Sequence, residues 1–141
     1  MAIDNYQISL KVFLQNKNGE TLILESPSHF DNWWFYDVPG GRIDVDEFDS
    51  TYVDILQREI AEELWVDIVV KISEKPVSFA RGSFSGLHIF YVYFVWECIS
   101  GDIVLSEEHI SLKWVKLDEI SPAKYFQKGL LEWVQSYLKY K

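Results

Sequence analysis

A single acidic helix set among strand-forming segments limits the folds open to this chain. Residues 49–64 have the spacing of an amphipathic helix, and Ser50 or Thr51 is the expected N-cap. The longest strand-forming segment is the aromatic and β-branched run from Leu87 to Ile99, which we expect to be a central strand. Strands on both sides of one helix, with a second helix at the end of the chain, predict a mixed α/β domain.

The other elements are expected from the alternation of apolar residues and from turn residues. We predict strands at 6–14, 21–24, 66–72 and 111–116, a short helical turn at 118–120 and a closing helix at 126–140. The sequence Asn-Lys-Asn-Gly at 16–19 is typical of a hairpin turn, and 26–32 is expected to be a loop. Val-Pro-Gly-Gly at 38–41 is expected to end any regular element.

Length and composition exclude several classes of protein. The chain has 141 residues, 48% of them hydrophobic, which predicts one globular domain over residues 1–141. The one cysteine, Cys98, rules out an intramolecular disulfide framework and a cysteine-rich zinc site. The first residues lack the pattern of a secretion signal, and the longest apolar run, Ile89 to Trp96, is too short to span a bilayer. We therefore expect a cytoplasmic protein that does not bind membranes.

The negative charge of the chain is concentrated in one segment. The net charge is −9, and residues 37–67 hold ten acids and two bases, so that segment alone carries −8. A nucleic-acid-binding protein needs a basic surface to displace counterions from phosphates, and none is visible here. The acidic segment is either a solvated surface or a site for divalent cations, and the spacing of its residues has to decide between them.

The spacing brings three carboxylates together on one side of the predicted helix. With about 100° per residue, Glu59, Glu62 and Glu63 share an arc of roughly 100°. They border an apolar stripe made of Val53, Leu56, Ile60 and Leu64. Such like charges destabilise an isolated helix by a few tenths of a kcal/mol per pair, and Arg58 can offset part of this through Glu62. A divalent cation is the natural partner for the rest, because Mg²⁺ and Mn²⁺ prefer carboxylate oxygen.

Together with Gly41 and Glu47 upstream, this stretch resembles the signature of the Nudix hydrolases. That signature runs Gly, five residues, Glu, seven residues, Arg-Glu, an aliphatic residue, any residue, Glu-Glu, any residue, Gly and an aliphatic residue. Here Gly41 precedes Glu47 by that spacing, and Arg-Glu-Ile-Ala-Glu-Glu at 58–63 matches the second half. The match extends over 26 residues, from Gly41 to Val66.

The chain departs from the signature at three places. Ten residues separate Glu47 from Arg58 where the family usually has seven, and we place the extra three at 48–50, outside the helix. Asp46 stands where the broader family often has Gly, and Asp tolerates left-handed backbone better than most residues. Trp65 replaces the last Gly, so we expect the helix to end differently.

The resemblance implies an α/β/α sandwich with a mixed β-sheet and an enzyme that cleaves a diphosphate linked to another moiety, using Mg²⁺ or Mn²⁺. It implies that the metal ligands are Glu59, Glu62 and Glu63, with the Gly41 carbonyl a possible extra oxygen. Arg58 and Glu47 would orient these ligands. Because clustered carboxylates raise one another's pKa, either Glu59 or Glu62 would suit the role of general base.

Several other residues are candidates for the site, and each of them also has a purely structural interpretation. Glu108 is a further metal-binding candidate or a solvated loop acid. Trp34 and Tyr36 precede the glycine turn, where a ring could stack on a nucleobase or pack in the core. Arg81 could reach a substrate phosphate or lie on a surface turn. His88 and His109 are expected to be structural.

The sequence thus predicts a Mg²⁺-dependent hydrolase of a nucleoside diphosphate derivative. Candidate substrates are nucleoside triphosphates, nucleotide sugars, ADP-ribose and dinucleoside polyphosphates. The alternative is a catalytically weak nucleotide-binding or sensor domain on the same fold, suggested by the three extra residues and Trp65, and a third option is an isomerase. Relatives are often dimers, so a homodimer is an open expectation.

Overall fold

The computed structural model describes residues 1–27, 34–64, 68–101, 103, 111–121, 131, 134, 135 and 137–139, with backbone alone at 26, 27, 34 and 35. The strands are β1 (Tyr6–Gln15), β2 (Thr21–Pro27), β3 (Trp34–Asp37), β4 (Gly40–Arg42), β5 (Val69–Lys71), β6 (Ser78–Phe84), β7 (Leu87–Ser100) and β8 (Ser111–Val115). A 3-10 turn, η1 (Val45–Glu47), precedes the helix α1 (Tyr52–Leu64). Leu131, Val134, Gln135 and Tyr137–Lys139 also have helical backbone. Among the described residues, no helix is long and apolar enough to cross a membrane.

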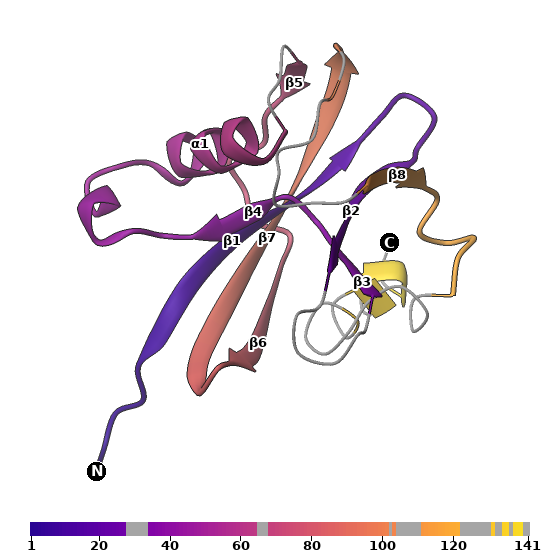
Figure 1. Cartoon of the computed structure of the whole chain (residues 1–141). Helices are drawn as coiled ribbons and strands as arrows, with labels where there is room; N and C mark the ends of the chain where they lie inside the picture. The colour runs from indigo at the N-terminus through magenta and orange to yellow at the C-terminus, as the bar shows by residue number, and fades with distance from the viewer. Residues whose placement is uncertain are drawn as a thin grey trace.

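The strands form one mixed sheet built around β1 and β7. These two strands run parallel, in register from Tyr6 opposite His88 to Gln15 opposite Glu97, and lie side by side in the middle of the molecule (Figure 1). The order is β3-β2-β1-β7-β5, with β4 paired to β1, β6 to β7 and β8 to β2. Parallel strands need a long crossover, and here the crossover from β1 to β7 contains α1.

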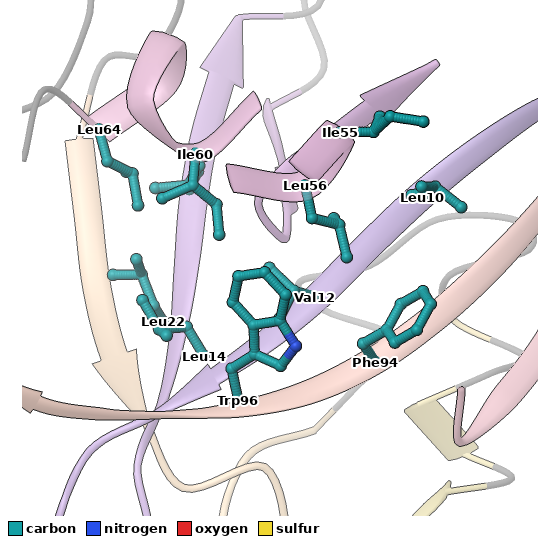
Figure 2. Packing of buried hydrophobic residues seen from close by; sticks show 11 residues of the cluster. Leu10, Val12, Leu14, Leu22, Ile55, Leu56, Ile60, Leu64, Phe94 and Trp96 are labelled. Carbon is teal, nitrogen blue, oxygen red and sulfur yellow. The ribbon is translucent and has the colours of Figure 1, made fainter. Parts of the chain in front are cut away.

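The two faces of the sheet bury different clusters because side chains alternate along β1. Leu10, Val12 and Leu14 face α1. There they pack with Leu56, Ile60, Leu64, Phe94 and Trp96, whose side chains converge between the helix and the sheet (Figure 2). Phe13 faces the other way and packs with Ile23, Tyr93, Val134 and Leu138. The sheet therefore lies between α1 and the helical residues at the C-terminal end, and the predicted α/β/α sandwich with a mixed sheet is confirmed.

Several locally encoded predictions are confirmed. The hairpin closes between Gln15 and Thr21, with Gly19 at a φ of +76° that favours glycine. Thr51 is the N-cap of α1, since its Oγ1 accepts a hydrogen bond from the Asp54 amide at 3.1 Å. The central strand, predicted from 87 to 99, runs from Leu87 to Ser100.

Other predictions are wrong or incomplete. The break predicted at 38–41 is confined to 38–39: β3 ends at Asp37, but Gly40 already begins β4 and pairs with Lys11 of β1. A Cβ on Gly40 would overlap the Leu10 carbonyl oxygen, so glycine is what lets the two backbones approach. Strand β6 was not predicted, since its sequence alternates weakly and pairing with β7 stabilises it. Residues 117–119 form a turn rather than a helix, and β5 is described only from Val69.

Replacing Leu56 by Ala should lower the free energy of unfolding by about 2–5 kcal/mol, because the side chain is fully buried in the cluster under α1. The neighbouring Gln57→Ala is the control, since Gln57 is exposed and its loss should change stability by less than about 0.5 kcal/mol. Urea unfolding of both variants measures the difference. Equal losses would contradict the packing described here.

Candidate active site

Helix α1 lies against β4, the strand that carries the glycine pair (Figure 1). A Cβ on Gly41 would overlap the Glu59 carboxylate, so this carboxylate occupies the space that any other residue would fill. The Gly40 N–H donates a buried hydrogen bond to Glu63 Oε1 at 3.1 Å. The two glycines thus hold two carboxylates, one by close packing and one by a hydrogen bond.

The carboxylates differ strongly in exposure. Glu63 is 6% exposed, the Glu59 side chain is 13% exposed, and the Glu62 side chain is 60% exposed. The apolar stripe predicts that all three lie where the buried face of the helix meets solvent; Glu59 is partly exposed, as this predicts, but Glu63 is buried. Ile55, on the side of Glu59 that faces away from the apolar stripe, is also buried and widens the buried face of the helix. Because β4 has no side chain at 40 or 41, this wider face can pack against it.

Arg58 is the central cation of the site. Its Nε and Nη2 donate to the two oxygens of Glu47 at 2.7 and 2.6 Å, a bidentate arrangement that favours strong, directional pairing. Nη1 donates to Glu62 at 3.1 Å, the helical pair expected from the sequence, and Nη2 lies 2.8 Å from Glu59 Oε1. One guanidinium therefore contacts three glutamates, and the Asp44 carboxylate lies 4.0 Å from Nη2.

The structure also shows how Glu47 reaches a helix that begins well after it. The Asp44 amide donates to Glu47 Oε1 at 2.9 Å and fixes the side chain at the end of η1. Residues 48–50 form the turn between η1 and α1. The extra residues assigned to this stretch thus leave the helix continuous.

The electrostatics of the site follow from burial and shared charge. Burial raises the pKa of Glu59; Arg58 opposes this shift, while the charges of Glu63 and Glu62 add to it. The hydrogen bond from Arg58 holds the pKa of Glu47 below its usual value. Arg58 contacts Glu47, Glu59 and Glu62, and the charge of Glu63 also acts on Glu59, so the cluster keeps an excess of negative charge. Such a cluster can hold a divalent cation or accept a proton.

The donor atoms suit a hard divalent cation, since carboxylate oxygens are the ligands that Mg²⁺ and Mn²⁺ prefer. In the part of the chain that the structure describes, however, no three acidic, histidine or cysteine side chains are gathered as a metal-binding group. Glu62 turns outward to Arg58, whereas Glu59 and Glu63 turn toward β4. Glu62 would have to leave Arg58 to become a third ligand.

The other predicted site residues lie elsewhere or outside the described structure. Arg81 is on strand β6, not on a surface turn, and its Nη1 lies 3.5 Å from the Tyr6 hydroxyl. Tyr36 is partly buried on β3, with the Lys113 ammonium 5.3 Å from its ring centroid. Trp34 is placed on β3 by its backbone only. Glu108 and Trp65 are outside the described residues.

One charged residue beside the site was missed by the sequence analysis. Lys11, on β1, is largely buried; its Nζ donates to Asp37 Oδ2 at 2.9 Å and to the Val38 carbonyl at 3.4 Å. Burial alone would lower the pKa of Lys11, but the charges of Asp37 and Glu63 outweigh it and raise this pKa. The sequence held one signal for it: Lys11 is two residues from Phe13 and so lies on the same side of the predicted strand. A lysine on a buried side of a strand needs an acidic partner.

The family model described as NUDIX domain matches residues 5–136. The chain belongs to the NUDIX family. This confirms the resemblance drawn from the sequence motif and extends it over nearly the whole chain. Among curated proteins, none matches the chain significantly.

Solved structures share the same fold. A MutT protein from Methanosarcina mazei Go1 is 22% identical, with 99% of this chain and 98% of that chain covered and a TM-score of 0.76. A Caenorhabditis elegans Ap4A hydrolase is 24% identical, with coverages of 95% and 98% and a TM-score of 0.69. A chain from Jonesia denitrificans, titled a possible asymmetric diadenosine tetraphosphate hydrolase, is 15% identical, with coverages of 96% and 94% and a TM-score of 0.78. The NUDIX assignment supports a diphosphohydrolase, and these likenesses, all below 25% identity, show the shared fold.

Replacing Gly41 by Ala should destabilise the NUDIX domain by about 1–3 kcal/mol, because the added methyl group displaces the Glu59 carboxylate. In a Glu59→Ala background the same change should be neutral, or stabilising by up to about 1 kcal/mol, since Ala restricts the unfolded chain. Urea unfolding of the two single variants and the double variant gives this coupling. Additive effects would contradict the contact between Gly41 and Glu59.

Proposed function

We propose that this chain is a metal-dependent diphosphohydrolase acting on a nucleoside diphosphate derivative. The observation that carries the proposal is the pair of carboxylates, Glu59 and Glu63, held against the glycines of β4 beside the Arg58 cluster. The structural neighbours titled as MutT and Ap4A hydrolase support a nucleotide-derived substrate. Nucleoside triphosphates, nucleotide sugars, ADP-ribose and dinucleoside polyphosphates are the candidate substrates.

The residues fit a division of roles in this reaction. Glu59, Glu62, Glu63 and the Gly41 carbonyl would hold Mg²⁺ or Mn²⁺. When bound, such a cation neutralises diphosphate oxygens and makes water a better nucleophile. Arg58 and Glu47 keep the carboxylates oriented, and the Gly40 N–H fixes Glu63.

The proton from the attacking water goes to a carboxylate of the cluster. The water oxygen forms a bond to phosphorus, the bond from phosphorus to the bridging oxygen breaks, and the leaving phosphate keeps that electron pair. Glu59 suits the acceptor role because its carboxylate lies against Gly41 and is largely buried, and burial raises its pKa. Glu62 is the other candidate, since it is exposed and close to the same guanidinium.

The remaining expectations belong to the same proposal. Residues 1–141 would form a single Nudix hydrolase domain, without a nucleic-acid or membrane partner. Glu108 would be a further metal ligand, and Trp34, Tyr36 and Arg81 would contact substrate. The cytoplasmic location and the homodimer stay predictions.

A catalytically weak nucleotide-binding or sensor domain is the second candidate. It is favoured by the outward position of Glu62, which contacts Arg58 instead of the carboxylates at β4. A panel of the candidate substrates, assayed with Mg²⁺ and with Mn²⁺ for release of phosphate or nucleotide, separates the two. Turnover of any of them supports the hydrolase, whereas binding without turnover supports the sensor.

Glu62→Gln should keep the fold and lose about a hundredfold or more in turnover, because one charged oxygen ligand becomes neutral. Asp54→Asn is the matched control, since it removes an exposed acid from the same helix without touching the cluster. Steady-state rates on the best substrate, with melting temperatures as a check on folding, measure both. Near-native activity of Glu62→Gln would refute the metal assignment.

Millimolar Mn²⁺ should stabilise the folded protein, by about 2.7 kcal/mol at a hundred times its dissociation constant, since a ligand that binds only the folded state shifts the unfolding equilibrium. Melting with and without Mn²⁺ gives this shift. Glu59→Gln should abolish most of it and Asp54→Asn should retain it. An unchanged melting temperature in the unmodified protein would count against a site for the ion.

A further inference from the structure

The two arginines of the acidic segment have opposite surroundings. Arg58 contacts the carboxylates described above, but Arg42 has no carboxylate partner in the part of the chain that the structure describes. Its Nη1 donates to the amide oxygen of Gln7 at 2.7 Å, and its guanidinium lies 5.6 Å from the centre of the Phe84 ring. Both partners are neutral, so neither offsets the positive charge of the exposed Arg42, which lies next to the glycine pair.

Strand register places Tyr91 beside this arginine. Ser9 of β1 is the cross-strand partner of Arg42 on β4 and of Tyr91 on β7, so all three side chains share one face of the sheet. Ser9 is short and only 3% exposed, and it lies between the strands that carry the two longer side chains. Burial raises the pKa of Tyr91; the charges of Lys11 and Arg42 lower this pKa, and the charge of Asp37 raises it.

The Tyr91 ring is held in place by its other contacts. It stacks on Tyr93 with 6.2 Å between ring centres, and a Cβ on Gly82 would lie 3.2 Å from its edge. In the described structure the hydroxyl makes no hydrogen bond. Lys11 is less available, because Asp37 already binds its ammonium. Arg42 is therefore the cation, and Tyr91 the hydroxyl donor, that this face offers to an anion.

This face lies across β4 from the carboxylates. Leu10, next to Ser9, points to the α1 side, and the open side of Gly41 points to Glu59 on that same side. Arg42 points the other way, one residue further along. Among the described strands β4 pairs only with β1. Its other edge has none of these strands beside it, so a ligand could pass around this edge from the α1 side of the sheet to the opposite side. Successive phosphates of one substrate could thus lie against the carboxylate side and the arginine side of one short strand.

We propose that Arg42 and Tyr91 form a phosphate-binding surface that selects substrates with three or more consecutive phosphates, namely nucleoside triphosphates and dinucleoside polyphosphates. A guanidinium pairs with two phosphate oxygens at once, and a phenol donates a further hydrogen bond. ADP-ribose and nucleotide sugars have two phosphates followed by a neutral sugar, so they place no anion there. The selection among substrates rests on the proposed function, whereas the binding of a phosphate chain at this surface does not.

Kinetics of Arg42→Gln and Tyr91→Phe test the selection. For the nucleoside triphosphate that the unmodified enzyme hydrolyses fastest, Arg42→Gln should raise KM about tenfold with little change in kcat, through loss of a charge-assisted contact. KM for ADP-ribose should not change. Tyr91→Phe should raise the same KM by a smaller factor, and Arg42→Lys should recover part of the loss. Equal effects on both substrates, or none on either, would overturn the selection.

Binding of inorganic tripolyphosphate in the presence of EDTA tests the surface without turnover. Calorimetry should show binding to the unmodified protein and to Lys17→Gln, which loses an exposed charge at the turn between β1 and β2, and about tenfold weaker binding to Arg42→Gln. If no compound is hydrolysed, the proposed function fails, yet selective loss in Arg42→Gln still supports the surface. Equal binding by the three proteins overturns it whatever the activity.

Discussion

The close contact between α1 and β4 determines the rest of the site. A carboxylate buried without a partner is costly, and α1 buries Glu63 and covers most of Glu59. The glycine pair accommodates both carboxylates where larger residues could not, because Gly41 leaves room for Glu59 and the Gly40 N–H donates a hydrogen bond to Glu63. The helix can therefore use one wide face both for the hydrophobic core and for acidic chemistry. Arg58 adds the charge that keeps this arrangement stable.

Strand β1 is where core and site are joined. Its residues alternate between the cluster under α1 and the opposite face, and it pairs with β2, β4 and β7. Leu10 packs beneath the helix, Lys11 binds the residue that ends β3, and Ser9 lies under Arg42 and Tyr91. A change in the position of β1 would therefore move the carboxylate face and the arginine face together. The long parallel pairing with β7, fully formed over ten residues, is what holds β1 in place.

How far the sequence predicts the structure depends on the range of the interactions involved. The helix, its Thr51 cap, the hairpin at Gly19 and the pair of Arg58 with Glu62 arise within a few residues, and all were predicted. Strands β4 and β6 are stabilised by pairing with β1 and β7. Their own sequences contain turn residues, so neither strand was predicted. The depth of Glu63 was misjudged for the same reason, since helical periodicity shows which residues share a face but not what covers it. Lys11 was missed because its partner Asp37 lies 26 positions away.

The distribution of cations explains how an acidic site can accept an anionic substrate. Charges in water are screened over about 8 Å at physiological ionic strength, so the net charge of the segment matters less than the groups next to the substrate. Arg58 is neutralised by its carboxylates and Lys11 by Asp37, which leaves Arg42 as the cation near β4 with only neutral contacts among the described residues. A substrate phosphate would meet repulsion on the α1 side of β4, relieved there only by a divalent cation, and attraction on the other side.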